Sequence, residues 1–500
     1  MARVGPKVKR WVRRDFDNVP AGQYLWSENH MVNAVLTLSR HGRNMAVTFD
    51  SSGYSHDHLV QRNYALMGGI RAIESALWVL IIVFFSGAII GLTFASAEAL
   101  ESGESTVAQY LWYPIYALIA GAMLLRLPAV LRLVSRNPLI IVCVLWIGLT
   151  YFWSIDPGTT LRRSVALLMT TLAGLVFAAR YDWGQMVQRL ALAVLILCLI
   201  TLCVALLNPP RGIMSEVHPG AWRGPWSEKN YLGGIMSKGF AVALCAFAMS
   251  PKRAWLWIPT AVLCVGLVLL STSKTALLAT MGCFLIFFVV RVFRRFPFLR
   301  VPLIWIVTAS VVGLGLLLTV GFEWALSLIG KDPTLTGRTD IWILLGRAIE
   351  QKYWLGYGYG TFWTDPLGPS YETRTVLQWA VPTAHNGWLD SWLSGGFVII
   401  ALFSSLLFLT ILKSIGRIKT GGVETYWVIL SLFFFILFSL SESSILQQND
   451  ISWFLFVATT AKLWAGDPAW WRPGSRGEQR GTVARMGIYR GPERRKARRD

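Results

Sequence analysis

Four short segments place a basic or titratable side chain beside the expected start of a helix. The segments are residues 222–234, 271–275, 336–342 and 384–390, and their candidate side chains are Arg223, Lys229, Asn230, Lys274, Arg338, His385 and Asn386. The first turn of a helix exposes unpaired backbone N–H groups and carries partial positive charge. Arginine or lysine added there creates an anion site, for which phosphate is the typical ligand. If the four helix starts converge, they would hold a diphosphate.

Each candidate also has a simpler interpretation. Arg223 and Lys229 could contact lipid headgroups, and Lys274 could extend its amine from a helix end to the membrane surface. Arg338 could pair with a nearby acid in its own loop. A loop histidine is usually structural or solvated, but His385 lies at a membrane boundary beside an asparagine and aromatic residues, which favours a functional role.

Tryptophan is frequent in the segments that we expect on the outer side of a membrane. The simplest interpretation is the interfacial aromatic belt of membrane proteins. Trp363 and Trp379 lie away from the expected helix ends, so they are the better candidates for a surface on which sugar rings stack.

The elements that must position these side chains are membrane helices. The chain has 500 residues, of which 54% are apolar and 15% charged, whereas an ordinary soluble domain is about 25% charged. The apolar residues form runs of about 17–25, the length that crosses a bilayer as a helix. The composition therefore predicts an all-α, polytopic membrane protein. It excludes an intrinsically disordered chain, a disulfide-rich secreted fold and a cytosolic enzyme.

The net charge of +20 would suggest nucleic-acid binding in a soluble protein. Here the basic residues lie in loops and tails between apolar runs, so we expect them to set membrane orientation and expect no nucleic-acid partner. The six cysteines lie inside apolar runs, and the sequence has no P-loop, HExxH or CxxC motif. We therefore expect no metal and no cofactor.

We count twelve apolar runs. They span approximately 74–96, 107–126, 137–153, 162–180, 186–207, 229–250, 254–272, 274–291, 300–321, 386–412, 424–441 and 450–466. If the N-terminus is cytoplasmic, the short inner loops carry almost only arginine and lysine, as the positive-inside rule requires. Both termini are then expected in the cytoplasm.

The chain is expected to have three parts. Residues 1–73 form a basic cytoplasmic tail, expected to be disordered, residues 74–466 form the membrane domain, and residues 467–500 form a second basic cytoplasmic tail. Two long loops, 208–228 and 322–385, fall on the outer side, where cytoplasmic ATP is not available. The second loop precedes the tenth helix, and its apolar spacing predicts an amphipathic helix at about 340–353.

The motifs, in chain order, resemble those of the O-antigen ligase and polymerase superfamily, and most closely the exopolysaccharide polymerases of the ExoQ type. The matching residues are Arg223-Gly224, Lys229-Asn230, Ser271-x-Ser273-Lys274, Thr336-Gly337-Arg338-Thr339, Gly356-Tyr357-Gly358-Tyr359-Gly360-x-Phe362-Trp363 and His385-Asn386-Gly387. The resemblance covers about residues 220–400. It implies a GT-C-like membrane fold with a large, partly helical periplasmic loop.

The resemblance also implies a metal-independent glycosyl transfer at the periplasmic face of the bacterial inner membrane. The donor would be a glycan on undecaprenyl diphosphate, Arg338 and Lys274 would contact the diphosphate, and His385 would be the general base. Substrate-binding candidates are Arg223, Lys229, Asn230, Asn386, Tyr359 and Trp363. Lys274 departs from the family pattern, in which arginine is commoner, and lysine lacks the bidentate fork of arginine. Glu228 stands where many relatives have histidine.

Three functions fit this resemblance or the membrane location. A polymerase would join lipid-linked repeat units into exopolysaccharide or O-antigen, and a ligase would transfer a finished glycan to lipid A core or another acceptor. A transporter of lipid-linked sugars would show intramembrane charges or symmetric halves, which the sequence does not suggest. Expected partners are the lipid-linked donor, a sugar acceptor and inner-membrane lipids. Proteins of chain-length control and export are further candidates.

Overall fold

The computed structural model describes residues 34–36, 47–49, 53–93, 106–215, 218–306, 309, 338–365, 367–378 and 381–466. The predicted tail 467–500, most of the tail 1–73, residues 322–337 of the long loop and most of the ninth apolar run lie outside the described residues. The chain divides into two units, Met1–Ala76 and Leu77–Asp500.

The first unit contains a departure from the all-helical prediction. Two three-residue strands, β1 (Ala34–Leu36) and β2 (Val47–Phe49), pair antiparallel with Ala34 opposite Phe49. Helix α2 (Gly53–Phe85) follows and runs into the second unit. It begins well before residue 74, because hydropathy marks only the apolar part of a helix and the preceding residues include good helix formers.

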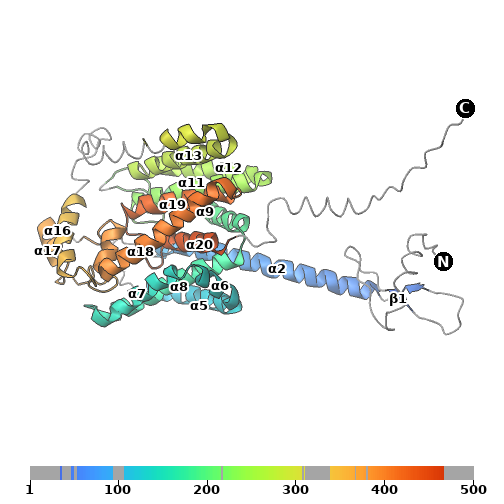
Figure 1. The fold of residues 1–500 in the computed structure, drawn as a ribbon, viewed down its shortest axis with the longest axis horizontal. Helices are drawn as coiled ribbons and strands as arrows, with labels where there is room; N and C mark the ends of the chain where they lie inside the picture. The colour runs from blue at the N-terminus through green and yellow to red at the C-terminus, as the bar shows by residue number, and fades with distance from the viewer. Residues whose placement is uncertain are drawn as a thin grey trace, which may run out of the picture. The chain divides into compact units, whose positions relative to one another are not determined.

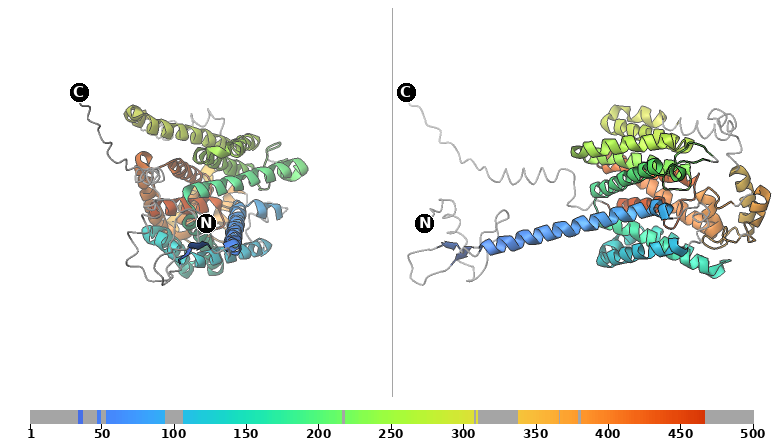
Figure 2. Two further views of the ribbon diagram at one scale, coloured as in Figure 1. Left: turned by 90° about the vertical axis from the view of Figure 1, so that its right-hand side faces the viewer. Right: turned by 180° about the vertical axis from the view of Figure 1, so that it is seen from behind.

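The second unit is a bundle of helices, seen from three sides in Figures 1 and 2. After α2 the main described helices are α3 (Ala88–Thr93), α5 (Thr106–Leu125), α6 (Leu127–Arg136), α7 (Leu139–Leu149), α8 (Pro157–Arg180), α9 (Trp183–Leu207), α10 (Pro209–Gly212), α11 (Lys229–Met249), α12 (Ala254–Leu270), α13 (Lys274–Arg295), α16 (Arg338–Gln351), α17 (Tyr371–Leu377), α18 (Gly387–Thr420), α19 (Glu424–Ser439) and α20 (Ile451–Ala465). Helices α16 and α17 lie at one end of the bundle (Figure 1). Helix α16 confirms the amphipathic helix that the sequence predicts at 340–353.

The chain is a polytopic membrane protein, as predicted. Among the described residues, seven helices are long and apolar enough to cross a membrane, or eight if α5 and α6, bent by 86° from each other, form one span. Shorter apolar helices cover Leu139–Trp153, Pro297–Ile306, Glu424–Ser439 and Ile451–Ala465. Every predicted run except most of the ninth falls on one of these helices, but the number of twelve spans stays a prediction.

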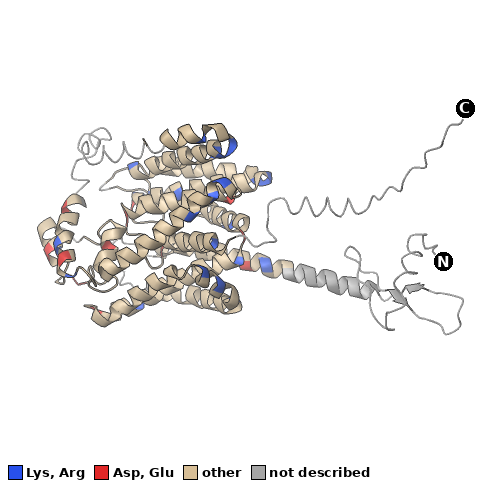
Figure 3. Cartoon of the chain, viewed as in Figure 1, with Lys and Arg blue, Asp and Glu red and all other residues tan. Residues whose placement is uncertain are grey.

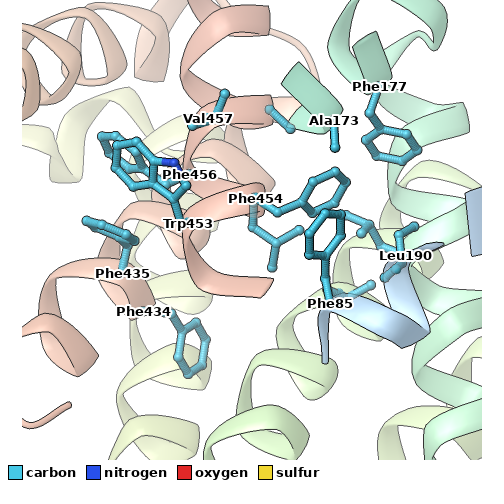
Figure 4. Close-up of a cluster of buried hydrophobic side chains, with 14 of the residues drawn as sticks. Phe85, Ala173, Phe177, Leu190, Phe434, Phe435, Trp453, Phe454, Phe456 and Val457 are labelled. Atoms are coloured by element: carbon cyan, nitrogen blue, oxygen red, sulfur yellow. The ribbon is translucent and has the colours of Figure 1, made fainter. Parts of the chain in front are cut away.

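Helix α20, one of the shorter apolar helices, is enclosed by other helices of the bundle. It packs closely on α8, where the Val457 side chain leaves no space for a side chain on Gly174. Figure 4 shows its aromatic side chains among those of neighbouring helices: Phe454 stacks on Phe85 with ring centroids 5.2 Å apart, and Phe456 lies 4.3 Å from Phe435. A helix that is apolar on all sides is stable when protein surrounds it, so α20 is a core helix of the bundle.

Charge separates along the bundle. Lys and Arg gather at the end where α12 begins and α13 ends, whereas most acidic side chains lie toward the opposite end, where α16 and α17 lie (Figure 3). Such an asymmetry is typical of helices held in one orientation across a membrane.

Helix α18 is broken at Gly396, a feature that the sequence analysis did not predict. Gly396 has φ 68° and ψ −168°, which divides the helix into a short first segment, residues 387–395, and a long second one. The carbonyls freed near the break accept hydrogen bonds from the glycine-rich loop: Tyr357 N donates to Leu393 O at 2.7 Å, and Gly358 N donates to Ser394 O at 3.2 Å. The loop 356–360 therefore holds the first segment of α18 in place.

Candidate active site

His385 lies immediately before α18 in an unusual backbone conformation. Its φ is 48°, the left-handed region that residues other than glycine rarely adopt. The next residue, Asn386, is the N-cap of α18, and its Oδ1 accepts hydrogen bonds from Trp388 N at 3.0 Å and Leu389 N at 3.3 Å. Strained residues persist where the surroundings over-determine them, and they are frequent at active sites. The cap therefore fixes the direction in which the His385 imidazole projects.

Glu442 faces the imidazole from the loop between α19 and α20. Its Oε2 lies 3.7 Å from His385 Nδ1. The Glu442 side chain is 35% exposed and the His385 side chain 21%. This separation is longer than a hydrogen bond, and Nδ1 makes no hydrogen bond within the described part of the chain. Such contacts are often long without substrate and tighten when it binds. The pair has the composition of a general base and the carboxylate that orients it.

Asp390 ties three segments together around His385. It lies one turn into α18 and accepts hydrogen bonds from Trp363 Nε1 at 2.9 Å, from Ala384 N at 3.2 Å and from the Ser443 hydroxyl. The glycine-rich loop, the residue before His385 and the residue after Glu442 are thereby held by one carboxylate. Trp363 thus has a structural contact, and its predicted stacking on sugar stays a prediction.

The start of α16 lies over the same segment. Trp342 Nε1 donates to Ala384 O at 2.9 Å. Arg338 is the first residue of α16, one helical turn before Trp342, so its backbone lies on the side of the helix that faces this segment. The Arg338 side chain lies outside the described residues. The predicted contact of Arg338 with the diphosphate stays a prediction.

A second group of predicted residues meets where α11 and α13 begin. Lys229 is the first residue of α11, and its Nζ lies 3.5 Å from Thr272 Oγ1 in the turn before α13. Asn230 Oδ1 accepts a hydrogen bond from Ser273 Oγ at 3.0 Å. Lys274 begins α13 and repels Lys229 electrostatically. Two ammonium groups at two helix N-termini form a place where a bound anion would relieve repulsion.

Two predicted substrate-binding residues have structural partners. The Arg223 guanidinium donates to the backbone carbonyls of Arg211 at 2.8 Å and Pro210 at 3.1 Å, so it braces its own loop. Tyr359 is buried, and its hydroxyl lies 2.5 Å from both Leu446 O and Gln448 Oε1. Burial raises the pKa of Tyr359, so the phenol stays neutral. Its hydrogen bonds hold the loop that carries Glu442. Substrate binding by either residue stays a prediction.

The sequence analysis missed Glu442, Asp390 and Lys238. Glu442 is an acid in the short Ser-Glu-Ser-Ser segment between two apolar runs, and Lys238 is a charged residue within an otherwise apolar run. An ionisable residue inside a membrane segment is a signal for function that could have identified Lys238. Among the described residues, no group of three or more His, Cys, Asp or Glu side chains could hold a metal ion.

Comparison with known proteins identifies two similarities. Residues 259–404 match the family model described as O-antigen ligase. The exopolysaccharide production protein ExoQ of Rhizobium meliloti (strain 1021) is 23% identical over 385 residues, covering 74% of this chain and 86% of that relative. The family match contains Lys274, Arg338 and His385 and ends before Glu442. These findings confirm the resemblance inferred from the motifs.

Proposed function

We propose that this chain, whose residues 259–404 match the family model described as O-antigen ligase, polymerises undecaprenyl-diphosphate-linked oligosaccharide repeat units into exopolysaccharide or O-antigen. Proteins of the family are membrane glycosyltransferases that use lipid-linked glycans. The similarity to a protein of exopolysaccharide production favours polymerisation. The single observation that supports the mechanism is the His385–Glu442 pair, because a histidine in a strained backbone conformation faces a carboxylate whose oxygen lies 3.7 Å from its Nδ1.

In the proposed reaction His385 acts as the general base. Its Nε2 accepts the proton of an acceptor sugar hydroxyl, while Glu442 accepts a hydrogen bond from Nδ1–H and stabilises the imidazolium that forms. The hydroxyl oxygen then bonds to the anomeric carbon of the donor. The bond from that carbon to the diphosphate breaks, and undecaprenyl diphosphate leaves with the electron pair. A direct displacement of this kind inverts the anomeric configuration.

The leaving diphosphate would be bound by Arg338, Lys274 and Lys229. Fixed cations stabilise the negative charge that develops on the leaving group, which lowers the barrier without a metal ion. The helix starts at Lys229 and Lys274 would add backbone N–H groups to this diphosphate contact. The undecaprenyl chain would remain in the bilayer beside the bundle.

The proposed location is the bacterial inner membrane, with twelve spans and both termini in the cytoplasm. The basic end of the bundle would face the cytoplasm, and the end with α16 and α17 would face the periplasm (Figure 3). The energy for transfer then comes from the donor's own phosphoester. Chain-length-control and export proteins would be partners at this face.

A single reaction tests the proposal. The purified chain receives one undecaprenyl-diphosphate repeat unit in the presence of EDTA, and products are sized on a gel. We expect a ladder from the wild type, none from His385→Ala, and a strongly reduced one from Glu442→Gln. Glu372→Gln is the matched control, because Glu372 is an exposed glutamate on α17, paired with Arg347. A full ladder from His385→Ala would show that another group is the base.

Ligation is the second candidate function, because the matching family is described by that activity. A ligase would make no ladder from donor alone but would transfer one glycan when lipid A core or another acceptor is added. A folded wild-type protein that transfers to neither acceptor would contradict both functions and favour transport.

A further inference from the structure

An apolar groove of about 530 Å³ lies between α11 and α12, two helices that pack side by side (Figure 1). It extends from Leu269 to Trp257 along α12 and from Phe240 to Phe247 along α11. Every described residue that lines it is hydrophobic or glycine. Its volume falls within the range of about 300–1,000 Å³ that is typical of ligand pockets. We call this feature the α11–α12 groove.

The groove opens to the side of the bundle, where a bilayer would lie. Two of its side chains, Val262 and Leu269, are more than half exposed. At Gly266 no described atom lies within 4 Å of the position that a Cβ would take, whereas a Cβ on Gly239 would lie only 3.1 Å from Cys264 Sγ. The groove is therefore an open hollow beside a tight contact of the same two helices.

One end of the groove adjoins the two lysines that begin α11 and α13. Thr272 N donates a hydrogen bond to Leu269 O at 3.0 Å, and Thr272 Oγ1 lies 3.5 Å from Lys229 Nζ. Lys274 follows two residues later at the start of α13. From this cationic end the groove continues to Trp257, about 18 Å further along α12 at 1.5 Å per residue. Such a layout suits an amphiphile with an anionic head and a long apolar chain.

Two properties favour a polyprenyl diphosphate over a phospholipid of the bilayer. The groove is a single channel, and a polyprenyl diphosphate has one chain whereas a phospholipid has two. Lys229 and Lys274 stand at the N-termini of two neighbouring helices, and each such end attracts a phosphate. Two phosphates in one head group can occupy both ends, but the single phosphate of a phospholipid cannot.

We propose that the α11–α12 groove binds the polyprenyl chain of the lipid-linked donor, with the diphosphate at the end where Lys229 and Lys274 lie. The inference rests on the proposed function, because that function makes the donor a polyprenyl diphosphate. It gives the chain a defined place beside the bundle. It also assigns a substrate contact to α11, which lies outside the family match at 259–404.

Gly266→Phe tests the proposal by filling the groove near its cationic end. Phenylalanine is a better helix former than glycine, and the Cβ position is open, so the variant should fold. We expect the KM for the undecaprenyl-linked donor to rise about 10-fold, equivalent to about 1.4 kcal/mol of lost contact. The kcat should change little, because the change leaves His385 and Glu442 untouched.

Gly121→Phe is the matched control. Gly121 lies on α5, outside the groove, and there too no described atom is within 4 Å of the Cβ position. Val262→Trp is a second way to fill the groove if Gly266→Phe does not fold, because Val262 lines the groove and is largely exposed.

The length of the donor's chain gives an independent measurement. The same repeat unit is supplied on undecaprenyl diphosphate and on the much shorter geranyl diphosphate. The wild type and Gly121→Phe should have a lower KM for the undecaprenyl donor. Gly266→Phe should lose most of this preference, because the long chain can no longer enter the groove.

Binding of undecaprenyl phosphate, followed by native mass spectrometry, separates the groove from the reaction. We expect the wild type and Gly121→Phe to bind it, and Gly266→Phe to bind it about 10-fold more weakly. An excess of phosphatidylglycerol should not displace it. Displacement by an equal concentration of phosphatidylglycerol would show that ordinary bilayer lipid fills the groove, and would overturn the inference.

The remaining outcomes also decide between the two proposals. An unchanged KM and unchanged binding in Gly266→Phe would overturn the inference, as would equal losses in Gly266→Phe and Gly121→Phe or a fall in kcat alone. A folded wild type that binds undecaprenyl phosphate in a Gly266-dependent way but transfers no glycan would refute the proposed function and still support the groove as a polyprenyl site.

Discussion

The break in α18 predicts a severe effect of Gly396→Ala. An alanine Cβ at this position would lie 2.0 Å from the Trp354 carbonyl oxygen and 2.3 Å from Leu355 N. Both are backbone atoms, so neither can rotate out of the way. The φ of 68° and ψ of −168° also belong to a region essentially confined to glycine. The loop that precedes residue 356 must therefore move away from α18.

Backbone strain and broken hydrogen bonds together set the magnitude of this effect. Strain at such a backbone position costs about 1–3 kcal/mol. Moving the loop also breaks the hydrogen bonds that Tyr353 O accepts from Phe397 N at 2.8 Å and from Trp392 Nε1 at 3.0 Å. The bond from Trp392 is exposed to water and is left out of the sum, whereas loss of the bond from Phe397 N costs about 1–3 kcal/mol. We expect the free energy of unfolding to fall by about 2–6 kcal/mol.

Thermal unfolding in detergent and the gel assay of transfer measure the two consequences. The midpoint should fall by about 5 °C or more. Transfer should be lost even below that temperature, because the first segment of α18, residues 387–395, carries Asp390 and follows His385. Gly416→Ala is the matched control: it lies in the same helix, open space surrounds its Cβ position, and alanine should stabilise it by about 0.5–1 kcal/mol. Equal stability and activity in the two variants would refute the proposed positioning by the break.

Three further predictions concern the site. Lys274→Arg should retain substantial transfer, and Lys274→Met should raise the KM for the donor several-fold; an unchanged KM in the methionine variant would exclude a diphosphate contact. Asn386→Ala should lower the free energy of unfolding by about 1 kcal/mol through loss of the cap and reduce kcat because His385 is released, whereas Asn386→Asp should keep the cap. Finally, EDTA should leave the initial rate of transfer unchanged, and a rate restored only by added Mg²⁺ would contradict cation stabilisation by side chains alone.

The local features of this fold were predictable from the sequence. Hydropathy located the apolar helices, and the spacing of Ile341, Leu345 and Ile349 predicted the helix that these buried residues anchor. Both signals depend on side chains within a few turns of one another. Hydropathy does not distinguish a helix that crosses lipid from one that protein surrounds, as it does α20, so the number of twelve spans stays a prediction.

The contacts between loops were not predictable. His385 and Glu442 are 57 positions apart in the numbering of the chain and approach to 3.7 Å only because α18, α19 and α20 pack side by side. The residue type of Arg223 fits an anion contact, which stays a prediction, whereas the hydrogen bonds from its guanidinium to backbone carbonyls follow from the fold alone. Residue type sets what a side chain can bind, and only packing decides which partner it meets.

The sequence by itself determined that this is a polytopic membrane protein with basic residues and a histidine at the starts of helices, because hydropathy and helix-end chemistry are local properties. The tertiary structure alone decided which carboxylate faces His385, that Gly396 breaks α18, and that Lys238 donates a hydrogen bond to Ser452. These depend on distant segments meeting in three dimensions, and a bilayer of about 30 Å allows many packings of the same apolar helices.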